Sequence, residues 1–340
     1  MTASRRHGMI RILAALIVLA PLVLLGCSIQ DYPQSTLHPR ADYAWDIQHL
    51  LENLLFWVAV IFVLVETALI VAVVRFRNRP GLPEPKHVHG HTGLEIAWTI
   101  APAIVLAFIA VPTVLTIFKT QSKAPAGALQ VRVIGHQWWW EFQYPELKIT
   151  TASEMHIPVG RPIAVSLETA DVIHAFWFPA MGGKRDVVPA RVNHMWFTAD
   201  SVGTFPGQCA ELCGTSHANM KKWLMVQTPE EFQGWVESQQ RLPIEPDSTT
   251  LAARGKQVFM DTGCLACHYI EGVAPGVIGP NLNHVGSRRS LAGALFENTP
   301  ENMAKWIENP PARKPGAIMP ALGLTPDQIA ALVAYLQSLK

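Results

Sequence analysis

The sequence predicts a multidomain membrane protein with a two-helix transmembrane hairpin, an all-β domain and an all-α domain. Two long apolar runs, at 54–74 and 96–118, predict the hairpin. Short β-prone runs that alternate apolar and polar residues predict the β-domain over residues 128–237. Apolar residues at helical spacing over 326–339, preceded by the capping-box residues Thr325 and Gln328, predict a closing helix in a helical domain over residues 250–340.

The first 26 residues have the features of a bacterial lipoprotein signal peptide. Arginines at positions 5, 6 and 11 form a basic start, and the apolar run 12–25 has signal-peptide length. The run ends in Leu-Leu-Gly-Cys, which resembles the lipobox, so Cys27 is the expected lipidated N-terminus of the mature chain. The alternative is that the run is retained as a third membrane helix. Residues 27–50 are expected to form a periplasmic N-terminal segment.

The hairpin is expected within residues 51–119. Each apolar run is long enough to cross a hydrocarbon core of about 30 Å. The loop between the runs is basic, and the positive-inside rule places such a loop in the cytoplasm. Its basic residues are Arg75, Arg77, Arg79 and Lys86. Everything after residue 119 is therefore expected on the periplasmic face of a bacterial inner membrane.

The composition agrees with this placement and excludes one class of partner. Hydrophobic residues make up 49% of the chain, and the net charge is only +1. Proteins that bind nucleic acid present strongly basic patches, and the sequence has none. No nucleic acid is expected as a partner.

The β-domain is predicted from several short strands separated by glycine and proline turns. The runs that alternate best are 129–134 and 162–168, and two further β-prone runs lie at 195–198 and 222–227. This pattern is typical of a sandwich or a barrel. The polar, proline-bearing segment 238–249 is expected to link the β-domain to the helical domain.

Residues 207–220 carry the most informative motif in the chain. Two cysteines, Cys209 and Cys213, are followed by His217 and then by Met220. Thiolate, imidazole and thioether ligands favour copper over calcium or magnesium. His174 is the best upstream candidate for a further nitrogen ligand. The alternative is a disulfide between the two cysteines, which would explain neither the histidine nor the methionine.

This motif resembles the binuclear copper A loop of the cytochrome c oxidase subunit II family. The resemblance implies a cupredoxin-like barrel for the β-domain and two copper ions in its loop. It also implies that Glu211 contributes its backbone carbonyl to copper, while its side chain faces a magnesium ion shared with subunit I. The implied copper ligands are His174, Cys209, Glu211, Cys213, His217 and Met220.

Two further residues gain roles from the same resemblance. The run Gly-His-Gln-Trp-Trp-Trp-Glu-Phe at 135–142 is similar to the family's aromatic stretch, in which the first tryptophan, here Trp138, is where electrons enter. A buried aromatic cluster is the simpler interpretation, and the two are compatible. Glu95 opens the second apolar run, where the family has a glutamate at the cytoplasmic mouth of a proton path. The alternative for Glu95 is an interfacial residue at a helix end.

A second redox motif lies in the C-terminal region. Cys264, Cys267 and His268 form the Cys-x-x-Cys-His pattern of covalent haem c attachment. Met319 lies between two prolines and is the expected sixth iron ligand, with Met303 as the rival. Residues 250–340 as a whole resemble a small class I cytochrome c, in which histidine and methionine ligation gives a high reduction potential. A thioredoxin-like site is disfavoured because no βαβ pattern surrounds the motif.

Taken together, the motifs resemble subunit II of a bacterial haem–copper terminal oxidase with a fused cytochrome c. The resemblance implies that electrons pass from haem c through copper A to subunit I, where O2 is reduced to water with proton translocation. The implied partners are subunits I and III, with a soluble cytochrome c or a quinol–cytochrome c reductase as donor. The alternatives are the copper A subunit of a nitric oxide reductase and a copper-binding lipoprotein.

Overall fold

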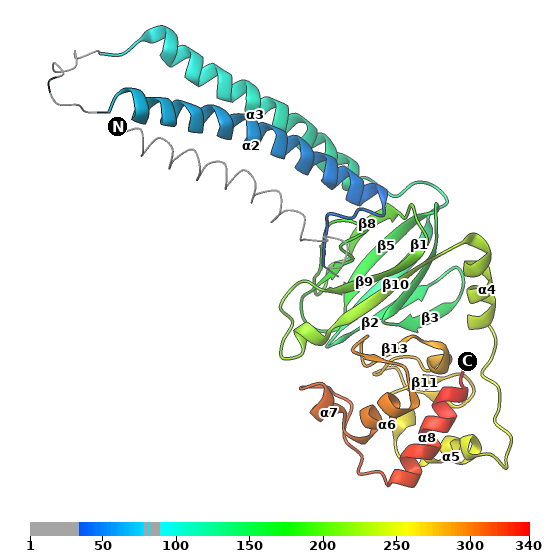
Figure 1. Cartoon of the computed structure of the whole chain (residues 1–340). Helices are drawn as coiled ribbons and strands as arrows, with labels where there is room; N and C mark the ends of the chain where they lie inside the picture. The colour runs from blue at the N-terminus through cyan, green and yellow to red at the C-terminus, as the bar shows by residue number, and fades with distance from the viewer. Residues whose placement is uncertain (1–33, 78–80, 82–88) are drawn as a thin grey trace, which may run out of the picture.

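The computed structural model describes residues 34–77, 81 and 89–340. The expected signal peptide and Cys27 lie outside the described residues. Figure 1 shows three parts in chain order: a helical hairpin, a β-sandwich, and a small helical domain on the side of the sandwich away from the hairpin. These parts agree with the fold class that the sequence predicts.

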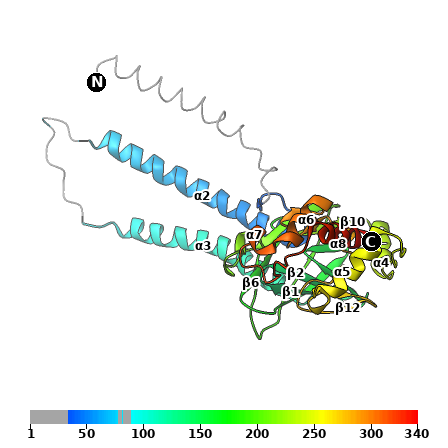
Figure 2. The same cartoon turned by 90° about the horizontal axis from the view of Figure 1, so that it is seen from below.

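The hairpin consists of α2 (Asp42–Arg75) and α3 (Thr92–Thr120). Both helices are long and apolar enough to cross a membrane. They pack side by side: the Asn53 amide donates to the Phe108 carbonyl oxygen over 3.3 Å, and the Trp57 and Phe108 rings stack. Apolar side chains cover their outer surfaces, which suits contact with lipid. Figure 2 shows the hairpin projecting away from the sandwich.

Helix α2 begins at Asp42, so residues 42–50 of the expected N-terminal segment are helical. The Asp42 carboxylate accepts a hydrogen bond from the Thr198 backbone N–H over 2.8 Å, and the Trp45 indole N–H donates to Asp200 over 2.7 Å. At the end of α3, the Lys119 ammonium pairs with Asp46 over 2.7 Å. The first two contacts fix the sandwich on one end of the hairpin, and the ion pair joins the two helices at that end.

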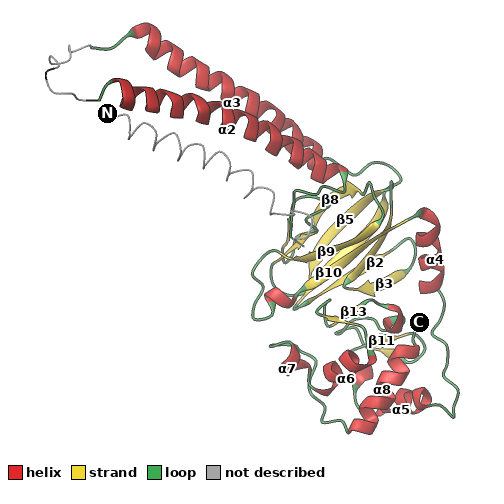
Figure 3. Cartoon of the chain, viewed as in Figure 1, coloured by secondary structure: helices red, strands yellow, loops and turns green. Residues whose placement is uncertain are grey.

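The β-domain is a sandwich of two five-stranded sheets (Figure 3). The first has the order β3-β2-β1-β5-β8 and the second β4-β10-β9-β6-β7. The first sheet contains β1 (Leu129–His136), β2 (Trp139–Tyr144), β3 (Ile149–Ala152), β5 (Pro162–Thr169) and β8 (Asn193–Thr198). The second contains β4 (Glu154–Pro158), β6 (His174–Trp177), β7 (Arg185–Val187), β9 (Gly203–Cys209) and β10 (Lys221–Gln227). The pairs β1–β5 and β4–β10 are parallel, and the others are antiparallel.

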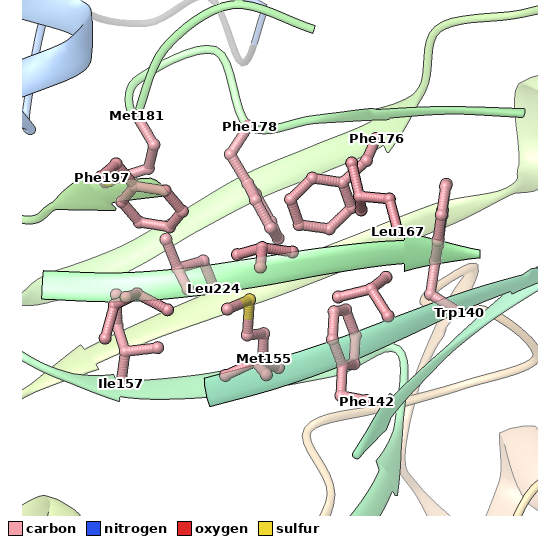
Figure 4. Packing of buried hydrophobic residues seen from close by; sticks show 14 of the residues in the cluster. Trp140, Phe142, Met155, Ile157, Leu167, Phe176, Phe178, Met181, Phe197 and Leu224 are labelled. Atoms are coloured by element: carbon pink, nitrogen blue, oxygen red, sulfur yellow. The ribbon is translucent and has the colours of Figure 1, made fainter. Parts of the chain in front are cut away.

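The core lies between the two sheets, where alternate residues of each strand point inward. Strand β5 shows the alternation clearly, since every second side chain from Ile163 to Leu167 is buried. Figure 4 shows aromatic and aliphatic side chains from both sheets meeting in this core. The labelled residues are Trp140, Phe142, Met155, Ile157, Leu167, Phe176, Phe178, Met181, Phe197 and Leu224.

Helix α4 (Pro229–Gln239) leads out of the sandwich to the C-terminal domain. The longer helices of that domain are α5 (Leu251–Asp261), α6 (Pro300–Glu308) and α8 (Pro326–Ser338), with a short α7 (Pro310–Arg313). Two small hairpins accompany them: β11 (Tyr269–Ile270) with β12 (Ala274–Pro275), and β13 (Ser290–Leu291) with β14 (Phe296–Glu297). The predicted capping box at the start of α8 is present, with Thr325 and Gln328 as its two side chains.

Helices α5 and α8 cross in close contact, and Gly255 permits it. A Cβ atom at Gly255 would lie 1.9 Å from the Ala331 carbonyl oxygen. The aromatic pair Phe259 and Tyr335 packs at the same crossing. This crossing forms one wall of the cavity described below.

Candidate copper and haem sites

The structure brings the copper-motif side chains together at one end of the sandwich. His174 begins β6 and Cys209 ends β9, and these strands pair with each other. The His174 Nδ1 atom lies 3.8 Å from the Cys209 Sγ atom, which lies 3.7 Å from the Cys213 Sγ atom. Cys213 Sγ in turn lies 3.5 Å from His217 Nδ1 and 3.8 Å from Met220 Sδ. Ligands distant in sequence therefore meet because two paired strands carry them.

These distances fit a metal centre and not a disulfide. A disulfide joins two sulfur atoms at about 2.05 Å, far below the 3.7 Å separation, and both cysteines are free thiols. Two donors bound to one ion at about 2.3 Å each can lie up to about 4.6 Å apart. Every consecutive pair in the cluster meets this limit. The donor set of two thiols, two imidazoles and a thioether suits copper.

The two thiols share one hydrogen bond, and their proton affinities diverge because of it. The bond to Cys213 lowers the pKa of Cys209, and the same bond raises the pKa of Cys213. The Glu211 carbonyl oxygen lies 3.2 Å from the Cys209 Sγ atom. This places the Glu211 backbone beside the sulfur cluster, while the residue itself is exposed at the surface.

Asp171 orients His174, although Asp171 was not among the site residues predicted from the sequence. Its Oδ1 atom lies 2.7 Å from His174 Nε2, while His174 Nδ1 faces the thiol of Cys209. Hydrogen bonding to His174 lowers the pKa of Asp171 against the opposing effect of burial. A carboxylate on the outer nitrogen of a ligating imidazole is a common arrangement. An acid three residues before a candidate histidine ligand was the available signal.

Trp138 lies between the copper loop and the C-terminal domain. Its indole N–H donates to the Cys213 carbonyl oxygen over 3.1 Å, and the Gln137 amide donates to the same oxygen over 2.7 Å. The residue is 8% exposed. On its other side, a Cβ atom at Gly316 would lie 2.6 Å from the indole ring. Trp138 is therefore packed against both candidate redox sites.

The C-terminal domain contains a cavity lined by all four candidate haem residues. These are Cys264, Cys267, His268 and Met319. The His268 Nδ1 atom lies 2.9 Å from the Pro280 carbonyl oxygen, so Nε2 is the nitrogen available for a metal. A Cβ atom at Gly279 would lie 2.6 Å from the His268 ring, so only glycine leaves room for this ring position.

The cavity also fits a large apolar group that carries carboxylates. Most of its lining is aliphatic or aromatic, from residues that include Phe259, Leu282 and Leu332. The Nε atom of Arg288 is buried at this cavity and has no hydrogen-bond partner among the described residues. A haem with its propionates would supply both the apolar surface and the missing acceptor.

Both candidate methionines line the cavity, but their surroundings differ. Met303 is 2% exposed, and its sulfur accepts a hydrogen bond from the Gln337 amide over 3.9 Å. Met319 lies in the loop between α7 and α8 and is partly exposed. Met319 therefore stays the preferred candidate for the sixth ligand.

The wall of the cavity facing the sandwich is built by the β-domain itself. Gln137, Trp138, Trp139, Ala152 and Ser153 contribute to it. Buried polar contacts hold this junction. The Glu154 carboxylate accepts from the Ser290 N–H and hydroxyl over 2.8 and 2.9 Å, and the Ser216 hydroxyl donates to the Pro315 carbonyl oxygen over 2.6 Å.

Glu95 lies far from both sites, at the start of α3 (Figure 1). Its carboxylate accepts a hydrogen bond from the His91 backbone N–H over 3.3 Å. The side chain of His91 in turn caps the helix by accepting from the Leu94 N–H. Glu95 is thus an exposed helix-start residue at the end of the hairpin remote from the sandwich.

Three families of known proteins match consecutive parts of the chain. The family described as cytochrome c oxidase subunit II, transmembrane domain, matches residues 40–116. The family described as cytochrome c oxidase subunit II, periplasmic domain, matches residues 146–227. The cytochrome c family matches residues 252–340.

Relatives from three organisms match about two thirds or more of the chain. Cytochrome c oxidase subunit 2 of Alkalihalophilus pseudofirmus is 38% identical over 94% of this chain and 94% of that protein. The Bacillus subtilis protein of the same name is 34% identical over 96% of this chain and 97% of its own length. Quinol oxidase subunit 2 of Bacillus spizizenii is 33% identical over 68% of this chain and 74% of that protein.

Among solved structures, the periplasmic domain of subunit II of cytochrome oxidase from Bradyrhizobium japonicum is similar to the chain. It is 39% identical, with a TM-score of 0.33, and it covers 35% of this chain and 96% of that structure.

Proposed function

The chain belongs to the cytochrome c oxidase subunit II family and carries a fused cytochrome c domain, and from this we propose a complete path for electrons through it. Electrons enter the C-terminal haem domain, cross at Trp138 to the copper loop, and leave for subunit I of a haem–copper oxidase. Oxygen is reduced to water in that subunit. Subunit III completes the complex, and a soluble cytochrome c or a quinol–cytochrome c reductase supplies the electrons.

One observation carries this proposal: Trp138 belongs to both sites. It lines the cavity that contains Cys264, Cys267, His268 and Met319, and its indole N–H donates to the carbonyl oxygen of Cys213. A single residue therefore contacts both the haem cavity and a copper ligand. Tethering makes this transfer intramolecular, with an effective concentration on the order of millimolar for a short linker.

The copper loop would hold two copper ions through His174, Cys209, Glu211, Cys213, His217 and Met220. Two copper ions held there would supply a one-electron carrier whose charge is spread over both metals, and their bond lengths would change little on reduction. The protein adds to this by fixing the ligands: His174 and Cys209 sit on paired strands, and Asp171 holds the imidazole ring. Because the ligands are held rigidly, the reorganisation energy of electron transfer at this site stays small.

In the haem domain, Cys264 and Cys267 would attach a haem covalently, and His268 and Met319 would ligate its iron. Pro280 orients the His268 ring through its carbonyl oxygen, and Arg288 offers a buried donor to a propionate. The apolar lining excludes water from the cavity. Trp138 closes the side that faces the copper loop.

The remaining assignments concern the neighbouring subunits. Glu211 would direct its exposed side chain to a magnesium ion at the boundary with subunit I. Glu95 would open a proton path at the cytoplasmic end of α3, since its carboxylate is exposed at the hairpin end remote from the sandwich. Cys27 would carry the lipid of the mature N-terminus.

Stopped-flow reduction of the purified complex tests the electron path. We expect Trp138→Ala to leave haem c reduction unchanged and to slow copper reduction by orders of magnitude. Trp139→Phe is the matched control, because Trp139 lines the same cavity but stacks on His136 instead of contacting the copper loop. Normal copper reduction in Trp138→Ala would remove Trp138 from the path.

Oxygen uptake, measured against nitric oxide uptake by the same complex, tests the terminal acceptor.

A further inference from the structure

Lys314 is a buried cation at the junction between the two redox sites, and the electron path above does not use it. It is 3% exposed, and its Nζ atom donates to the Trp138 carbonyl oxygen over 2.5 Å and to the Ala292 carbonyl oxygen over 2.6 Å. It also lines the haem cavity. The same amine therefore contacts the backbone of the proposed electron-transfer residue and borders the cavity that would hold haem.

The charge of Lys314 is not neutralised by a nearby acid. In the described part of the chain, Lys314 forms no ion pair, and its two hydrogen-bond acceptors are neutral carbonyls. A buried ammonium without a carboxylate partner pays a desolvation cost that favours its neutral form. Burial accordingly lowers the pKa of Lys314 to about 7. Its proton is thus gained and lost near neutral pH.

Among the charged groups that face Lys314, none other is expected to gain or lose a proton near neutral pH. From the copper loop, Cys213 raises the pKa of Lys314 by its charge, and it would be held by copper. From the cavity wall, His268 would be held by iron, and burial lowers the pKa of Arg288 only to about 10. Glu154 faces Arg288 and is engaged by Ser290. On its own element, the neighbouring Arg313 is exposed.

We propose that Lys314 is a redox-linked proton-binding residue that also positions the haem domain on Trp138. An electron that arrives in the haem domain adds negative charge beside the cavity and favours the ammonium form. One electron comes from the reduced donor protein, and one proton from periplasmic water forms the third N–H bond of Lys314. Both leave when the electron passes on to the copper domain. The inference rests on the proposed function, since it needs haem in the cavity.

Linkage fixes the expected pH dependence of the reduction potential. If reduction favours protonation, protonation must favour reduction by the same factor. The haem c midpoint potential is therefore constant below the pKa of the oxidised state, falls as pH rises above it, and is constant again above the pKa of the reduced state. A tenfold difference in proton affinity between the two states corresponds to about 59 mV for a one-electron couple.

Four forms of the intact complex test this by spectroelectrochemical titration of haem c between about pH 5.5 and pH 9. The wild type should show the two plateaus and the slope between them. Lys314→Met is permanently neutral and should give a flat profile near the high-pH plateau of the wild type. Lys314→Arg is permanently charged and should give a flat profile near the low-pH plateau. Arg313→Met is the control, since that exposed neighbour should leave the wild-type profile intact.

A wild-type slope that survives in Lys314→Met or in Lys314→Arg would overturn the inference. So would a flat profile in the wild type. The haem absorption and the copper content of each variant show whether it is assembled, and Lys314→Arg provides a second route if the neutral variant does not assemble. Absence of haem or copper from the wild-type complex would instead contradict the proposed function.

Discussion

The copper loop and the haem cavity arrange their donor atoms in different ways. At the copper loop, the donor atoms already lie within about 4 Å of one another, and His174, Cys209, Cys213 and Met220 are each at most 3% exposed. At the haem cavity, the donor residues surround an open space, and Cys264, Cys267, His268 and Met319 are all partly exposed. One set of donor atoms forms a closed cluster, and the other lines a space with room for a large prosthetic group.

The difference follows from the framework beneath each site. Two paired strands of a rigid sandwich hold His174 and Cys209, and the loop between β9 and β10 carries the other copper ligands back against them, so the sandwich determines the ligand distances. The haem residues lie on loops and short turns between α5 and α8, and part of the cavity wall comes from the neighbouring domain. We therefore expect the copper site to lose its metal when a single ligand is replaced. We expect the haem domain to lose thermal stability when haem is not attached.

The largest effect is expected from removing one bridging thiol. Cys213 contacts Cys209, His217 and Met220, so Cys213→Ser breaks three of the donor contacts at once. We expect loss of both coppers, loss of the mixed-valence paramagnetic signal, and a fall in oxygen consumption of at least about 100-fold, because removing one of several residues that act as a unit costs about as much as removing all of them. Metal analysis and electron paramagnetic resonance of the purified complex measure this.

Haem c should remain attached and reducible in the same variant, because the cavity does not depend on the thiol. A variant that kept two coppers per complex would show that the loop is not organised around Cys213. Such a result would remove the contrast between the two sites.

The sequence could predict the copper loop because its ligands are nearly contiguous. Cys209, Cys213, His217 and Met220 lie within one segment whose spacing alone indicates a metal. The strands β6 and β9, which carry His174 and Cys209, were not among the predicted strands. The capping box at Thr325 and the apolar face of α8 were predicted for the same reason, since both depend on residues a few positions apart. Local patterns were sufficient in each case.

The junction between the domains could not be predicted in this way. Lys314 and Trp138 are 176 residues apart in sequence, and Glu154 and Ser290 are 136 apart. A buried lysine and a buried glutamate look like ordinary surface residues until two domains dock and remove their water. The helical start of α2 at Asp42 was missed for a related reason, because polar residues there contact the sandwich instead of lipid.

An intermediate effect is expected when haem attachment is blocked. The double variant Cys264→Ala/Cys267→Ala should leave the cavity without its covalent group, and an unfilled apolar cavity costs several kcal/mol by the usual scale of about 24 cal/mol per Å³. Since about 1 kcal/mol shifts the Tm of a domain of this size by about 4–8 °C, the haem domain should melt at least about 10 °C lower. Differential scanning calorimetry of the complex measures the transition.

Copper content should be unchanged in that double variant, since the sandwich supports its ligands independently. If copper were also lost, the two sites would depend on each other through the Trp138 junction. The copper site and the haem cavity would then not be supported independently of each other.

The smallest effect is expected from the residue that only orients a copper ligand. Asp171→Asn keeps an oxygen near His174 Nε2 but removes the negative charge that strengthens the imidazole as a donor. We expect copper affinity to fall by about tenfold, at the low end of the range for such partners, with the copper spectrum retained in form. Competition with a copper chelator measures the change. Asp186→Asn is the matched control, because Asp186 is an exposed acid on β7, the strand that pairs with β6 and carries no ligand. An unchanged copper affinity in Asp171→Asn would mean that the strands alone orient His174. The rigidity of the copper site would then come from the sandwich and not from the Asp171 carboxylate.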